Sequence, residues 1–196
     1  MANSILAESV MAESVIGNSV MDKNTEHQYK LYQQALLVHH KSPVGFEKVI
    51  EVDGFFSADN PTCGDEITVQ VQLSSSKEQV EQISFFGDSC AICRASASLL
   101  CEHLADKPTD EVSLTVKQLV LALNHKNTYS SESTSTSTNT KTNLNTEITL
   151  PPNFSALAVV QKFPVRKQCA LLPWTTFEQA LTLAQLNRTS VNTVTD

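Results

Sequence analysis

The stretch "NPTCGDEITVQVQL" (residues 60–73) joins a turn to a strand and does most to decide the fold. In its second half, apolar and polar residues alternate, as in a strand with one buried face. The side chains expected on the buried face are Ile67, Val69, Val71 and Leu73. In its first half, Cys63 and Asp65 share a tight turn that is bracketed by proline and glycine. Three explanations are open for this pair of residues: they are two metal ligands, they form the surroundings of a reactive thiol, or their proximity is a coincidence.

Further elements are expected on both sides of this strand. We expect a helix over 27–40, ended by Lys41-Ser42-Pro43, and a first strand in "FEKVIEVDGFF" (46–56), broken around Asp53-Gly54. The segment "VEQISFFGD" (80–88) is expected to pair with the 66–73 strand through a Ser/Lys turn. Further helices are expected over 91–105, 112–123 and 166–186. The predicted fold class is α+β, with a small antiparallel sheet of about three strands packed against helices on one side.

The chain is expected to form one domain over 25–187 with polar additions. Residues 1–24 repeat a short Glu-Ser-Val unit and are expected to be a disordered or weakly helical tail. The segment 126–150 is rich in Ser and Thr, too polar to pack, and is expected to be a disordered insert. Residues 188–196 form a polar C-terminal tail.

Composition excludes several classes of partner. The net charge of -7 and the scattered basic residues argue against nucleic-acid binding, which requires clustered Lys and Arg. No apolar run approaches the roughly 20 residues of a membrane-spanning helix. The N-terminus has Glu where a secretory signal has Lys or Arg, so we expect a cytoplasmic protein. In that compartment the five cysteines indicate metal binding or thiol chemistry rather than a disulfide framework.

Two further cysteines lie at predicted element junctions. Cys90 lies where a strand gives way to a helix, and the helix dipole there favours a thiolate. Cys169 follows a proline at the start of the last helix, and Arg166 lies three residues before it, close enough to stabilise a thiolate. Three such cysteines with Asp65 suit a tetrahedral site of three sulfurs and one oxygen. Spacing alone leaves this site undecided, because its ligands are far apart in sequence.

The remaining candidates have simpler interpretations. Cys93 lies one turn after Cys90 and could reach the same site, although packing is the simpler role. Cys101 is expected to be a buried free cysteine on the inner face of its helix. His103 is expected to face solvent, and His39 and His40 to have capping or surface roles.

Three motifs in order give the chain a family resemblance. "NPTCGDEITVQVQL", "FFGDSCAICRASASLL" and "KFPVRKQCALLPW" together resemble the IscU/SufU/NifU N-terminal family of iron–sulfur cluster assembly proteins. The similarity runs from about residue 29 to 186 and implies the family's α+β fold. Gln168 stands where IscU-type members have a histidine, and Arg166 and the longer segment before the last motif are SufU-like.

The resemblance implies a site and a process. Cys63, Asp65, Cys90 and Cys169 match the family's ligand or reactive positions. Cys93 departs from relatives that often have serine there, and could add a fourth thiolate. The implied function is that of a zinc-dependent persulfide acceptor working with a SufS-like cysteine desulfurase and passing sulfur to downstream scaffold or acceptor proteins.

Three interpretations stay open at this point. In the first, Cys63 accepts the sulfur, with Cys169 as the alternative acceptor. In the second, the same four residues hold a nascent [2Fe–2S] cluster as a non-enzymatic scaffold. In the third, the chain is a zinc-stabilised interaction protein without sulfur chemistry. Whether the chain is an enzyme therefore stays undecided.

Overall fold

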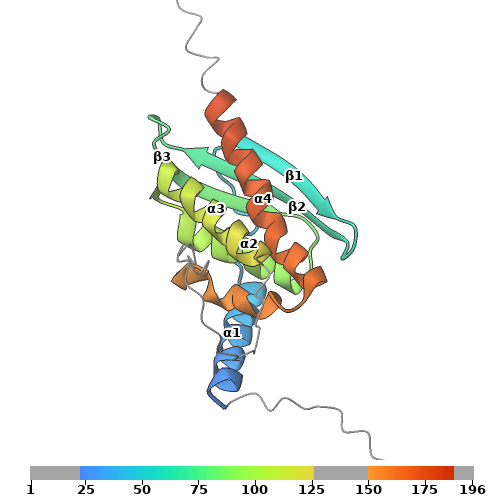
Figure 1. Cartoon of the computed structure of the whole chain (residues 1–196). Coiled ribbons are helices and arrows are strands. Elements are labelled where there is room, and N and C mark those ends of the chain that lie inside the picture. Colours follow the sequence, from blue (N-terminus) through green and yellow to red (C-terminus); the bar gives the residue numbers. More distant parts are fainter. Residues whose placement is uncertain (1–22, 126–149, 188–196) are drawn as a thin grey trace, which may run out of the picture.

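The computed structural model describes residues 23–125 and 150–187, which form a sheet with helices (Figure 1). The predicted tails and the Ser/Thr-rich insert lie almost entirely outside these residues. The elements in chain order are α1 (Lys23–Lys41), β1 (Gly54–Asn60), β2 (Asp65–Leu73), β3 (Gln79–Phe86), α2 (Ala91–Leu104), β4 (Lys107–Pro108), α3 (Thr109–Asn124), the 3-10 helix η1 (Pro152–Val160) and α4 (Pro164–Asn187). Each predicted helix is present within a few residues of its expected bounds.

The sheet is antiparallel, in the order β1-β2-β3-β4. Side chains along β2 alternate between buried and more exposed positions, which confirms the alternation expected from the sequence. The buried set includes Val69 and Val71, which are almost fully enclosed. The fold class was therefore predicted correctly, although a short fourth strand, β4, extends the expected sheet of about three strands.

The segment predicted as the first strand is a strand only from Gly54 onward. Phe46 forms an isolated parallel bridge with Phe85 at the β3 edge of the sheet. Asp53, seven residues later, already donates its backbone N–H to the carbonyl of Val71 on the β1 side of β2. The chain must cross from one edge of the sheet to the other between these points, so it cannot stay in one ladder. Glu47, at the start of the crossing, has a positive φ of 51°.

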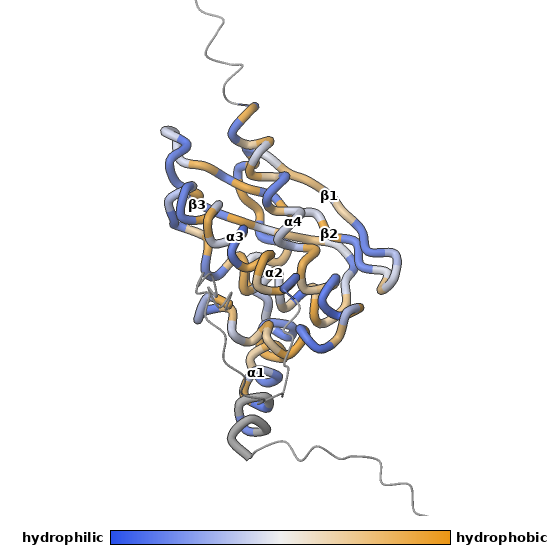
Figure 2. The backbone as a smooth tube through the Cα atoms, in the orientation of Figure 1, coloured by the Kyte–Doolittle hydropathy of each residue, from blue (hydrophilic) through white to orange (hydrophobic). Residues whose placement is uncertain are grey.

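Helices α2 and α4 pack against the sheet, and α4 lies across β1 and β2 (Figure 1). The apolar residues of the strands and of α2 meet in the middle of the molecule, whereas the turn between β2 and β3 is hydrophilic (Figure 2). Gly54 allows a close contact with α4: a Cβ there would lie 2.4 Å from the backbone nitrogen of Ala184. Helix α4 therefore packs directly on the backbone of β1.

A buried hydrogen-bonded chain joins α2 to α4. The indole N–H of Trp174 donates to Ser96 Oγ over 2.8 Å, and that hydroxyl donates to the carbonyl of Ala170 over 2.7 Å. All three residues are buried, so replacing the serine would leave the Trp174 N–H unsatisfied. This chain sets the relative position of the helices that carry Cys90 and Cys169.

Helix α1 is attached to α2 through His39. Its Nδ1 lies 2.8 Å from Ser98 Oγ, and its Nε2 lies 3.5 Å from the carboxylate of Glu102. Burial lowers the pKa of His39, and the nearby Glu102 carboxylate offsets this only in part. The expectation of a capping or surface role for His39 was wrong, because the ring lies between two helices. His103 is likewise only 27% exposed and packs edge-on against Phe154, so the solvent-facing prediction was also wrong.

Among the residues that the structure describes, no helix has the length and apolar character needed to cross a membrane.

Replacing Gly54 by alanine tests the contact between β1 and α4. The new methyl group would overlap the backbone of α4, which cannot move aside as a flexible side chain would, so we expect unfolding to become easier by about 1–3 kcal/mol. Urea denaturation measures this change. The control is Ser57→Ala in the same strand, at an exposed position, where we expect less than about 0.5 kcal/mol. Equal effects of the two variants would contradict the packing described here.

His39 should make stability depend on pH. Its pKa is lower in the folded chain than the ordinary value of 6.5, so the unfolded chain binds the proton first as the pH falls. We therefore expect the free energy of unfolding to fall as the pH drops below about 7, and to level off once the folded chain is also protonated. The His39→Asn variant should lack this part of the slope in urea titrations from pH 7.5 to 5, while His125→Gln, at an exposed position, should keep it. An unchanged slope in His39→Asn would contradict the assignment.

Candidate metal centre

The turn between β1 and β2 presents Cys63 and Asp65. The backbone N–H groups of Cys63 and Gly64 both donate to the carbonyl of Asn60, over 3.1 and 2.9 Å. Gly64 has a φ of 69°, a conformation that glycine adopts without steric cost. Asp65 is the first residue of β2 and pairs with Asn60, the last residue of β1. The hairpin thus places the thiol in the turn and the carboxylate at the end of the ladder.

Cys90 meets this hairpin from the start of α2, where it is the N-cap residue. Its backbone N–H donates to Asp65 Oδ1 over 2.7 Å. The carboxylate therefore occupies the position at a helix N-terminus that favours an anion. This contact joins the first residue of β2 to the first turn of α2.

Cys169 reaches the same point from the N-terminal part of α4 and is completely buried. The side-chain amide of Asn60 donates to Asp65 Oδ2 over 3.3 Å and lies 3.5 Å from Cys169 Sγ. Sequence reasoning did not select Asn60 as part of the site. Its position at the end of β1, opposite Asp65, becomes visible only when the hairpin register is known.

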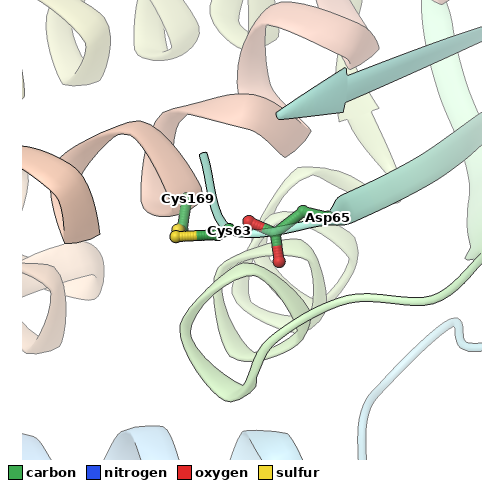
Figure 3. Close-up of side chains that lie close together, drawn as sticks. All are labelled: Cys63, Asp65 and Cys169. Carbon is green, nitrogen blue, oxygen red and sulfur yellow. The ribbon is translucent and has the colours of Figure 1, made fainter. Parts of the chain in front are cut away.

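Three of the four predicted ligands form one cluster. One potential ligand atom from each of Cys63, Asp65 and Cys169 lies within 4.8 Å of the others. Figure 3 shows the two sulfurs pointing toward each other, with the carboxylate of Asp65 beside them. The fourth residue, Cys90, lies outside this three-residue group but donates its backbone N–H to Asp65 Oδ1. Three of the four side chains thus come together, and the backbone of the fourth residue contacts one of them, although the four belong to three segments far apart in sequence.

The charges in this cluster suit a cation. Burial alone would raise the pKa of Asp65, but the hydrogen bonds from Cys90, Cys169 and Asn60 outweigh burial and lower it. Burial raises the pKa of Cys169, and its hydrogen bonds with neighbouring side chains raise it further. The cluster without metal therefore contains a fixed carboxylate and a buried protonated thiol. A metal ion bound here would displace the thiol protons. The resulting thiolates and the Asp65 carboxylate would then balance its positive charge.

The donor set fits zinc. Three cysteine sulfurs and one carboxylate oxygen are ligands that Zn²⁺ accepts in tetrahedral sites. The fixed hydrogen bonds to Asp65 from Cys90 and Asn60 would orient that ligand. Metal binding by these four residues nevertheless stays a prediction.

The other candidate residues lie outside the cluster. Arg166 lines a groove with apolar residues of α1, α2 and η1, and its role in stabilising a thiolate stays a prediction. Cys101 is buried, as expected. Cys93 is also buried and is not part of the three-residue cluster. Burial raises the pKa of Cys93, and nearby Asp65 and Cys90 contribute to this effect.

Pro173 is a second feature that the sequence analysis missed. It lies inside α4, four residues after Cys169. Proline has no N–H, so the Cys169 carbonyl does not receive the usual helical hydrogen bond from residue 173. The backbone ladder of α4 is therefore interrupted in the turn that carries the site cysteine.

Comparisons with known proteins show which family this chain resembles. The NifU-like N-terminal domain matches residues 31–148. The chain is 28% identical over 151 residues to the zinc-dependent sulfurtransferase SufU of Bacillus subtilis, covering 77% of this chain and 89% of that protein. It is 30% identical over 151 residues to the iron–sulfur cluster assembly scaffold protein IscU of Streptococcus pyogenes, covering 77% of this chain and 82% of that protein.

A solved structure shares the fold. It belongs to a putative iron–sulfur cluster assembly scaffold protein for the SUF system from Fervidobacterium islandicum, with a TM-score of 0.56 and 22% identity over 78% of this chain and 98% of that one. Together with the match over more than half of the sequence, this likeness confirms the resemblance seen in the three cysteine motifs. The chain belongs to the family of NifU-like N-terminal domains, with SufU and IscU proteins among its relatives.

Proposed function

We propose that this protein accepts persulfide sulfur from a cysteine desulfurase in iron–sulfur cluster assembly, with zinc bound at Cys63, Asp65, Cys90 and Cys169. The proposal rests on one observation above all. Two thiols and a fixed carboxylate converge where a hairpin turn meets the starts of two helices, a third cysteine donates its backbone N–H to that carboxylate, and one of the two thiols is in a solvent-accessible turn. A relative named as a zinc-dependent sulfurtransferase supports the choice of chemistry.

Differences in exposure favour Cys63 as the acceptor. Cys63 is partly exposed, whereas Cys169 is fully buried. The space beside Gly64 is open, since a Cβ built there meets no atom within 4 Å. A partner cysteine can therefore approach Cys63 without moving a helix, but it cannot reach Cys169 in the same way. The alternative acceptor from the sequence analysis is thus less accessible.

The transfer step requires an attacking thiolate on Cys63 and a leaving thiolate on the partner's cysteine. The sulfur of Cys63 would attack the terminal sulfur of the partner's Cys–S–SH group, forming Cys63–S–SH and releasing the partner's cysteine as a thiolate. When bound, zinc would keep the site cysteines deprotonated. Zinc would be held by Cys63, Asp65, Cys90 and Cys169, and the hydrogen bonds from Cys90 and Asn60 would keep Asp65 in its orientation while Cys63 reacts.

The same residues support a second function, as a scaffold for a nascent [2Fe–2S] cluster. Three thiolates and a carboxylate can also bind such a cluster, and a carboxylate holds it less firmly than a fourth thiolate would. The similarity to an IscU scaffold, at 30% identity, favours this alternative. The buried position of Asp65 and Cys169 suits either occupant. The two functions are distinguished by what the site binds, which is zinc for sulfur transfer and a [2Fe–2S] cluster for the scaffold.

Metal and sulfide content is the first test. In protein purified without oxygen we expect about one zinc per chain and no acid-labile sulfide, because the cluster offers one tetrahedral set of donors. The Cys63→Ala variant should lose most of this zinc, whereas Cys101→Ala, a buried cysteine outside the site, should keep it. Iron and sulfide in near-equal amounts would instead support the scaffold function. A folded protein without either metal would contradict the site.

The second test locates the acceptor. The protein is incubated with a SufS-type desulfurase and cysteine, and persulfides are then trapped by alkylation. Trypsin separates Cys63 and Cys169 into different peptides, because Lys77 and Arg94 lie between them. We expect the extra sulfur on the Cys63 peptide, and a loss of more than ~10-fold in Cys63→Ser. Extra sulfur on the Cys169 peptide in the unmodified chain would contradict the assignment.

A further inference from the structure

The pair Cys90 and Cys93 is not explained by the four-residue site. The sequence "CAIC" (90–93) separates two cysteines by two residues at the start of a helix, an arrangement typical of dithiol redox centres. Cys93 is outside the three-residue cluster and has no part in the proposed sulfur transfer.

The first turn of α2 places these two thiols beside each other. Cys90 is the N-cap residue and Cys93 is the third residue of the helix. The turn is closed, since the N–H of Arg94 donates to the carbonyl of Cys90 over 3.0 Å. Helical geometry then separates their Cα atoms by about 5 Å, within the range that a disulfide bridges. The Cys90 side chain makes no capping hydrogen bond, so its sulfur is not tied to the backbone N–H groups of this turn.

The two thiols differ in accessibility. Cys90 is partly exposed, while Cys93 is completely buried. A reagent in solution can therefore reach Cys90 and not Cys93, whereas Cys93 can reach a sulfur bound to Cys90. In a pair of this kind, the exposed thiol forms a mixed disulfide with an outside partner. The buried thiol then attacks that disulfide and releases the partner.

We propose that Cys90 and Cys93 are a redox-active dithiol, in which Cys93 resolves a disulfide or persulfide formed on Cys90. Cys93 attacks Cys90 Sγ in Cys90–S–S–R, the Cys90–Cys93 bond forms, the S–S bond to R breaks, and the proton of Cys93 leaves with the product RSH. When R is a hydrogen atom, the product is hydrogen sulfide. The oxidant is the incoming disulfide or persulfide itself.

This reaction would also act on the metal site. A disulfide takes Cys90 out of the proposed set of ligands, so oxidation should release zinc. The dithiol shares Cys90 with the proposed metal site, but its oxidation is detected on the peptide with Cys90 and Cys93, whereas sulfur transfer is detected at Cys63. An experiment can therefore show the failure of the Cys90–Cys93 dithiol without also showing the failure of sulfur transfer at Cys63, and the reverse.

Glutathione disulfide is a suitable probe, because a single tryptic peptide reports the result. The peptide over 78–94 contains Cys90 and Cys93 and no other cysteine. The full-length chain is equilibrated with mixtures of reduced and oxidised glutathione, as purified and after zinc removal, and is then quenched with acid and digested. In the unmodified chain we expect this peptide to lose two hydrogen atoms, with little glutathione attached. In Cys93→Ala we expect a mixed disulfide at Cys90, at least ~10-fold more abundant than in the unmodified chain.

Two controls make the result decisive. Cys101→Ala removes another buried cysteine of α2 and should leave the Cys90–Cys93 oxidation unchanged. Circular dichroism and zinc content of Cys93→Ala and Cys93→Ser show whether the fold and the metal site are intact, and we expect both to be retained. Equal amounts of mixed disulfide with and without Cys93, or no reaction of Cys90 in either zinc state, would overturn the proposal. So would loss of zinc from a folded Cys93→Ala, because Cys93 would then be a metal ligand.

Discussion

The buried carboxylate of Asp65 is the group on which the arrangement of the site depends. It receives the backbone N–H of Cys90 at the start of α2 and the amide of Asn60 from the end of β1. The same amide lies against the sulfur of Cys169. A buried anion is tolerated only when such donors surround it. The sheet, α2 and α4 are therefore fixed relative to one another at the point where the thiols meet.

Accessibility divides the five cysteines by role. Cys63 and Cys90 are partly exposed, whereas Cys93, Cys101 and Cys169 are buried. Burial disfavours a free thiolate, so the buried thiols gain nucleophilic or ligating character only from a metal or a neighbouring sulfur. The chain thus limits which sulfurs meet an outside partner to those at the turn before β2 and at the start of α2. We expect chemistry at Cys93 and Cys169 to pass through these two.

Much of this molecule could be predicted from its sequence, for identifiable reasons. The alternation of Ile67, Val69, Val71 and Leu73 predicted β2, because one face of a strand must be buried. The crossing at 47–53 was mistaken for a strand, since its apolar residues resemble a strand when the two edges it connects are unknown. The four site residues were grouped by family resemblance, because residues so far apart cannot be placed together by spacing. The contacts of Asn60 and His39 depend on tertiary neighbours and gave no local signal, whereas Pro173 was visible inside the predicted last helix and was overlooked.

The interrupted ladder at Pro173 divides α4 into two parts with different attachments. The part after the proline is held on the sheet by the close approach of Ala184 to Gly54. The part before it carries Cys169 and contacts α2 through Ala170 and Ser96, and the same Ser96 hydroxyl accepts the N–H of Trp174 just after the proline. Because one backbone hydrogen bond is missing between these parts, local opening of the first turns need not unfold the whole helix. The sulfur end of α4 can therefore act as a separate cooperative unit, and its stability can respond to whatever occupies the site while the sheet stays intact.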